Sequence, residues 1–120
     1  MDRCRTCLQI KNERLVRFLS EFFATALLLF IGLGIVFQFI LTHEKMNAWI
    51  NINIGWGFAL MFCIYATSQT SGGHMNPAVS FLMYTLGNLS LADFFIYSII
   101  QVAGAFFGAS LAYGVYYGNF

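Results

Sequence analysis

Formal charge nearly disappears from this 120-residue chain after Lys45, where the only Asp, Glu, Lys or Arg is Asp93. A water-exposed surface cannot be built from residues 46–120 without more charge than this. The whole chain is 9% charged and 59% hydrophobic, whereas soluble domains carry about a quarter charged residues. The composition predicts a membrane protein. It excludes a disordered chain, and the net charge of +1 excludes a strongly basic nucleic-acid binder.

Three long apolar segments set the expected architecture: residues 18–41, 50–67 and 94–117. At 1.5 Å per residue each helix would be roughly 27 to 36 Å long, enough to cross a hydrocarbon core of about 30 Å. The first segment is too long for the apolar core of a cleaved signal peptide, about 7 to 15 residues. The prediction is an all-α membrane protein with three transmembrane helices.

Basic residues give the expected orientation. Five of them precede the first span, at Arg3, Arg5, Lys11, Arg14 and Arg17, and only Lys45 lies beyond it. Because cytoplasmic flanks carry the excess of Lys and Arg, the tail of residues 1–17 is predicted to be cytoplasmic.

The cysteines do not predict a metal site. Cys4 and Cys7 form one C-x-x-C pair in the tail, but tetrahedral zinc needs two further ligands and none lies near. Reduced cytosolic thiols are the simpler interpretation, with lipidation of one thiol as an alternative. We expect no metal and no cofactor.

The uncharged stretch between the second and third spans predicts a short helix that enters the membrane without crossing it. Gly72 and Gly73 permit left-handed backbone, Asn76 is a favoured helix N-cap and Pro77 a favoured first helical residue. A helix over residues 76–86 would be roughly 16 Å long, about half the hydrocarbon thickness. Irregular backbone at membrane depth is tolerated only where it is buried in protein or lines a water-filled cavity. The passage therefore predicts a path for solute.

The same passage carries a family resemblance. The sequence SGGHMNPAVS, residues 71–80, resembles the first Asn-Pro-Ala signature of the aquaporin family. Residues 20–23 resemble the family's acidic-aromatic start of the first span, and residues 101–109 its third span. The ending at residues 113–117 is particularly similar to glycerol facilitators. The resemblance covers about residues 17–118 and corresponds to one of the family's two inverted repeats, residues 18–120 here.

The resemblance implies roles for the signature residues. Asn76, Pro77 and Ala78 would cap the half-helix at the pore centre, with the Asn76 amide donating to a passing oxygen. The positive end of the half-helix dipole would disfavour cations at that point. The residues expected to supply a track of carbonyl oxygens are Gly72, Gly73, His74 and Met75.

Further residues acquire expected roles in the same way. Trp56, 20 residues before Asn76, corresponds to an aromatic selectivity-filter residue; the alternative is a Trp in the interfacial belt. Glu21 and Gln101 are expected to be structural supports rather than functional groups. Gly104 and Gly108 form a small-x-x-x-small pair for close helix packing.

The resemblance thus implies a channel of the aquaglyceroporin type for passive transport of glycerol, other small uncharged solutes and water. A single repeat is not expected to form a complete pore. The alternative is a non-conducting truncated isoform that associates with related channel chains and modulates them. An intramembrane enzyme using Cys63 or Ser80 with His74 is disfavoured, because the sequence offers no orienting acid near His74, so we expect no enzyme.

Location and partners follow from the same resemblance. We expect an integral protein of the plasma membrane, with retention of a truncated form in the endoplasmic reticulum as the alternative. Expected partners are membrane lipids, the small neutral solutes and related channel chains in an oligomer, with no nucleic acid.

Overall fold

The computed structural model describes residues 10–119, which form helices and no strands. The long helices are α2 (Glu13–Leu41), α3 (Trp49–Thr67) and α5 (Leu91–Tyr116), which a short 3-10 turn, η1 (Tyr117–Asn119), extends. Each is long and apolar enough to cross a membrane. The short helix α4 (Pro77–Thr85) lies between α3 and α5 in the chain. The predicted fold class, three long helices plus one short helix, is confirmed.

α2 and α5 begin several residues earlier than the apolar segments that predicted them, and α3 begins one residue earlier. α2 begins at Glu13, because the Asn12 side chain caps it by accepting a hydrogen bond from the backbone N–H of Leu15 at 3.2 Å. α5 begins at Leu91, where Ser90 is the cap. Polar residues in a capped first turn are helical without being apolar, so hydropathy alone misses them.

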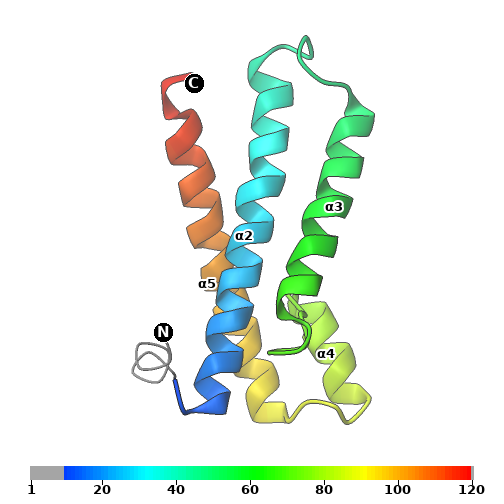
Figure 1. The fold of residues 1–120 in the computed structure, drawn as a ribbon, viewed down its shortest axis with the longest axis vertical. Helices are drawn as coiled ribbons and strands as arrows, with labels where there is room; N and C mark the ends of the chain where they lie inside the picture. The colour runs from blue at the N-terminus through cyan, green and yellow to red at the C-terminus, as the bar shows by residue number, and fades with distance from the viewer. Residues whose placement is uncertain (1–9, 120) are drawn as a thin grey trace, which may run out of the picture.

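α4 occupies only one end of the bundle. Figure 1 shows it beside the lower part of α5, at the end where α2 and α5 begin and α3 finishes. Its nine residues make a helix of about 14 Å, less than half of a hydrocarbon core. The Phe94 ring at the start of α5 packs against the rings of Phe81 and Tyr84, with centroids 5.8 Å and 6.1 Å away. The short helix is thus held against α5 by aromatic side chains.

Close backbone contact joins α2 to α5. The buried residues of α5 recur every three or four positions and form one stripe that includes Gln101, Gly104 and Gly108. A Cβ atom on Gly104 would lie 2.6 Å from the Phe22 carbonyl oxygen, and one on Gly108 would overlap the backbone of Ala26. Only glycine at these two positions lets the helices approach so closely.

An ion pair fixes the same two helices at the end where they begin. Asp93 accepts from Arg14 at 2.6 Å and from Arg17 at 3.4 Å. The Asp93 side chain is 10% exposed, whereas the Arg14 side chain is 58% exposed. Because Arg14 is largely solvated, the pair orients the helix ends more than it stabilises them.

Substitution of the contact glycines tests the α2–α5 interface. We expect Gly104→Ala and Gly108→Ala each to lower the free energy of unfolding by about 1–3 kcal/mol, because the added methyl group must displace backbone rather than a flexible side chain. The measurement is equilibrium unfolding by titration with sodium dodecyl sulfate in mixed micelles.

Gly114→Ala on the same helix is the matched control, since a Cβ atom there meets nothing within 4 Å. Helix propensity alone makes this change neutral or slightly stabilising. Equal losses at all three positions would contradict the proposed backbone contact.

Candidate functional site

The segment between α3 and α4 has an irregular backbone that three residues with positive φ impose. Gly72 has φ 97° and Gly73 has φ 63°, the left-handed conformation predicted for these glycines. Met75 also has a positive φ of 49°, which costs a non-glycine residue of order 1 kcal/mol or more. Such a conformation persists only where surrounding interactions hold it.

The carboxylate of Glu21 holds this segment. Glu21 is fully buried, and its Oε1 accepts from the Ser71 hydroxyl at 2.7 Å and from the His74 backbone N–H at 2.9 Å. Its Oε2 accepts from the Met75 backbone N–H at 2.7 Å and from the Gln101 amide at 2.9 Å. An ionised carboxylate is an acceptor with about four lone-pair sites, so these four donors match its capacity.

A second group of hydrogen bonds supports the first. Gln101 Nε2 also donates to Ser80 Oγ at 2.9 Å, and Ser80 Oγ lies 3.1 Å from the Nδ1 atom of His74. Tyr97, which is fully buried, donates its hydroxyl proton to the Ser71 carbonyl oxygen at 3.0 Å. Side chains of α2, α4 and α5 therefore all contribute to fixing residues 71–75.

The orientation of two peptide units follows from these bonds. The N–H groups of His74 and Met75 point at Glu21. In a trans peptide the C=O group points opposite to the N–H group of the same unit, so the carbonyls of Gly73 and His74 point away from Glu21. Within residues 10–119 no hydrogen bond reaches the carbonyl oxygens of residues 72–75. These oxygens therefore have no partner among the described residues, although His74 and Met75 are buried as whole residues.

Asn76 caps α4 as the sequence predicted. Its backbone is extended, and its Oδ1 accepts from the Ala78 backbone N–H at 2.9 Å, with Pro77 as the first helical residue. The Asn76 side chain is exposed, and in the described part of the chain no acceptor is recorded for its Nδ2 group. Since Oδ1 is used by the cap, the group turned outward is a donor.

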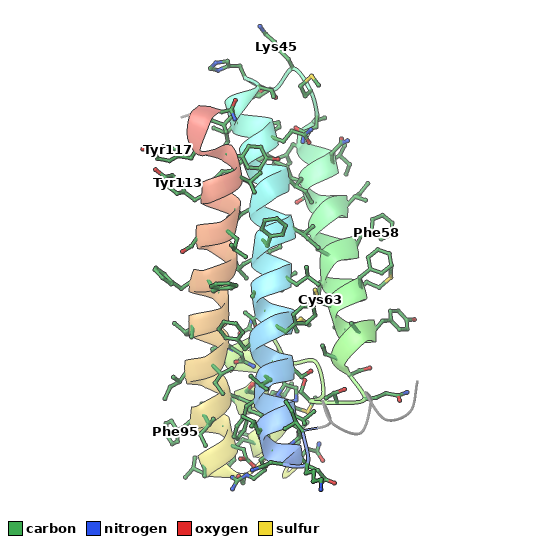
Figure 2. The ribbon with its side chains drawn as sticks, turned by 60° about the vertical axis from the view of Figure 1, so that its left-hand side comes forward. Lys45, Phe58, Cys63, Phe95, Tyr113 and Tyr117 are labelled. Carbon is green, nitrogen blue, oxygen red and sulfur yellow. The ribbon has the colours of Figure 1, made fainter. Side chains whose placement is uncertain are left out.

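Trp56 lies outside the hydrogen-bonded group. The side chain is partly buried and packs against an apolar cluster that includes Met75. The other buried members of that cluster are Ala24, Leu28, Ala59 and Cys63. Trp56 thus contacts this cluster through packing rather than through hydrogen bonds. Figure 2 shows Cys63 on the inner side of α3 and Phe58 on its outer side.

The residues of the disfavoured enzyme interpretation are close but inaccessible. Ser80 lies within hydrogen-bond distance of His74, yet Ser80 is fully buried and Cys63 is 1% exposed. The expectation that no acid lies near His74 is wrong, because Glu21 does. Glu21 accepts a hydrogen bond from the His74 backbone N–H group, however, and not from the imidazole ring. Among the described residues no three His, Cys, Asp or Glu side chains could hold a metal ion. Cys4 and Cys7 lie outside the described residues.

Three members of the group had no role in the sequence-based expectation: Ser71, Tyr97 and, as a hydrogen-bonding residue, Ser80. Tyr97 precedes Gln101 by four residues, so both lie on one face of α5. This four-residue spacing is the sequence signal that could have identified Tyr97 as a partner of the same site. Ser71 and Ser80 are the first and last residues of the signature passage, and their roles depend on contacts that no local pattern specifies.

Comparison with known proteins identifies relatives of this chain. The family model described as "Major intrinsic protein" matches residues 9–119. Aquaporin-9 of Mus musculus is 44% identical over 99 residues, which cover 82% of this chain and 34% of that protein. The glycerol uptake facilitator protein of Escherichia coli (strain K12) is 35% identical over 102 residues, 85% of this chain and 36% of that protein. This chain spans about a third of the length of these relatives.

A solved structure is also similar. The X-ray structure of the aquaglyceroporin from Plasmodium falciparum superposes with a TM-score of 0.78 at 32% identity, covering 88% of this chain and 43% of that one. The resemblance to the aquaglyceroporin type that the motifs indicated is confirmed.

Substitution of the buried acid tests the hydrogen-bonded group. Glu21→Gln replaces one acceptor oxygen with an NH₂ group that faces N–H or O–H donors. We expect the free energy of unfolding to fall by about 2 kcal/mol or more, because buried donors lose their acceptor. The measurement is again equilibrium unfolding in mixed micelles.

Glu13→Gln is the control, because Glu13 lies exposed in the first turn of the same helix. This change should cost at most about 1 kcal/mol through the helix dipole. If both variants lose the same small amount, Glu21 does not organise the segment.

Proposed function

Because this chain belongs to the major intrinsic protein family, we propose that it forms one repeat of an aquaglyceroporin-type channel that lets glycerol, other small uncharged solutes and water cross the membrane passively. The observation that carries the proposal is the orientation of the peptide units after Gly73 and His74. Their N–H groups are bound to Glu21, so their carbonyl oxygens are directed to the other side of the segment.

The chemistry of this surface suits hydroxyl groups. Carbonyl oxygens of residues 72–75 accept hydrogen bonds from the hydroxyl protons of a polyol or water. The free amide of Asn76 donates to the oxygen of the same molecule. The N-terminal end of α4 has a partial positive charge, which disfavours cations at that point. The carbonyl oxygens of residues 72–75, called the carbonyl row below, together with the Asn76 amide would recognise neutral molecules that carry hydrogen-bond donors and acceptors.

Trp56 is proposed as the aromatic wall of the selectivity filter. An indole face offers a flat apolar surface for the carbon side of a polyol, while polar groups hold its hydroxyls. The proposal is supported by the packing of Trp56 against the cluster that contains Met75. Trp56 also lies inside α3, which begins at Trp49, rather than at the end of the helix, where an interfacial belt residue belongs.

A second wall is needed to enclose the solute. The outer face of α3 is apolar and exposed in this chain, with Phe58 54% and Phe62 62% exposed. We propose that a segment corresponding to the unmatched part of the relatives completes the channel, and that the 120-residue chain alone does not conduct.

We propose that the protein spans the plasma membrane. In the proposed orientation the start of α2 lies in the cytoplasm. This orientation is supported by Arg14 and Arg17 at the beginning of α2 and by the single Lys45 at the opposite end of the bundle (Figure 2).

A chimera tests the proposed function. Residues 9–119 replace the matching segment of the E. coli glycerol uptake facilitator protein, and proteoliposomes are challenged with a glycerol gradient in stopped-flow light scattering. We expect glycerol entry well above that of empty liposomes, because this chain supplies the carbonyl row and the cap. The chain alone in liposomes is the comparison and should match empty liposomes.

Entry at the rate of empty liposomes by a correctly inserted chimera would contradict the proposal. Within the chimera, Trp56→Ala should change the ratio of glycerol to water permeability, since the apolar wall is removed. An unchanged ratio would exclude the filter role of Trp56 while leaving the channel function intact.

A further inference from the structure

α2 and α3 are in close contact at two glycines, one on each helix, and each glycine forms a notch that a side chain of the other helix fills. On α2, a Cβ atom at Gly32 would lie 2.5 Å from Cε2 and Cη2 of the Trp56 indole. On α3, a Cβ atom at Gly55 would lie 2.5 Å from Cδ1 of Ile35. Each helix thus offers one glycine that a large side chain of the other helix covers. The two notches lie within one turn of each other on both helices.

The indole fills the space that the Gly32 side chain would occupy. Gly32 is buried in the middle of α2, where glycine costs about 1 kcal/mol relative to alanine. All three of the nearest atoms to its Cβ position belong to the Trp56 ring. The position of the ring is therefore coupled directly to the absence of a side chain at residue 32.

α2 is anchored to α5 about two to three turns before Gly32. Its backbone at Phe22 and Ala26 is already in contact with Gly104 and Gly108 of α5. The Trp56 side chain, in contrast, is only partly buried. Because a methyl group at residue 32 would meet the far end of a flexible side chain rather than backbone, we expect it to displace the indole away from α2.

From these contacts we infer that Gly32 is a specificity-determining residue: it sets how far the Trp56 indole projects and thereby which solutes pass. The inference rests on the proposed filter role of Trp56. Gly32 itself contacts no solute and acts as a positioning residue. A displaced indole narrows the path, and narrowing excludes a three-carbon polyol before it excludes water.

The transport test uses the chimera described above. Gly32→Ala should lower glycerol permeability by about tenfold, the lower end of the discrimination that one misplaced methyl-sized group produces in a tight site. Water permeability should fall much less, so the glycerol-to-water ratio falls. Adding Trp56→Phe to Gly32→Ala should restore part of the ratio, because the smaller ring leaves room for the methyl group.

Two glycine-to-alanine variants are matched controls. A Cβ atom at Gly34 on the same helix would have an ordinary contact, 3.9 Å from Tyr116, and one at Gly57 beside Trp56 on α3 meets nothing within 4 Å. Both should keep the wild-type ratio. A wild-type ratio for Gly32→Ala in a conducting chimera, or the same change in all three variants, would overturn the inference.

A spectroscopic measurement on the 120-residue chain tests the notch separately. The chain has two tryptophans, Trp49 and Trp56, so Trp49→Phe leaves Trp56 as the only indole. Gly32→Ala in this background should raise acrylamide quenching of its fluorescence in nanodiscs, and Gly34→Ala should not. Unchanged quenching would overturn the inference, whereas a wild-type chimera that fails to conduct would overturn the proposed function itself.

Discussion

The buried carboxylate of Glu21 is the constraint on which the rest of the structure depends. In a segment with φ above zero at three of four consecutive positions, the N–H groups of Gly73, His74 and Met75 have no backbone acceptor among the described residues. Glu21 accepts two of those N–H groups together with the Ser71 hydroxyl and the Gln101 amide. Satisfying the N–H side of the backbone with a fixed acceptor leaves the carbonyl side free. The surface that we propose to meet a solute is therefore a consequence of where one buried acid lies.

The place of Glu21 depends in turn on helix packing. α2 is held on one side by the backbone contacts of Gly104 and Gly108, and on the other by the notch in which Trp56 covers Gly32. Glycines thus allow close contact on both faces of α2: Gly104 and Gly108 of α5 on one face, and Gly32 of α2 itself on the other. Toward α5 they bring Gln101 and Tyr97 within reach of the irregular segment, and toward α3 they fix an aromatic ring. Rigid supports of this kind are what a selective path requires, because a side chain that is free to shift discriminates poorly.

Local chemistry was sufficient to predict much of this arrangement. Apolar length predicted three long helices, and Asn76 followed by Pro77 predicted the start of α4 because capping is decided by adjacent residues. The early starts of α2 and α5 were missed, since a cap such as Asn12 extends a helix into polar sequence. The partners of Glu21 lie 50 or more residues away in the chain. Such pairs follow from packing, which periodicity does not specify, so a supporting role could be expected for Glu21 while the identity of its donors could not.

Residue-specific hydrogen exchange of the 120-residue chain in lipid nanodiscs, measured by NMR, tests the central claim most directly. If Glu21 binds the backbone N–H groups of His74 and Met75, both amides exchange slowly, at rates comparable to those of buried Gln101 in α5. The exposed loop residue Met46 supplies the fast reference. Exchange of His74 and Met75 as fast as that of Met46 would contradict the claim, because without this acceptor nothing would hold the carbonyls of the irregular segment in the proposed orientation.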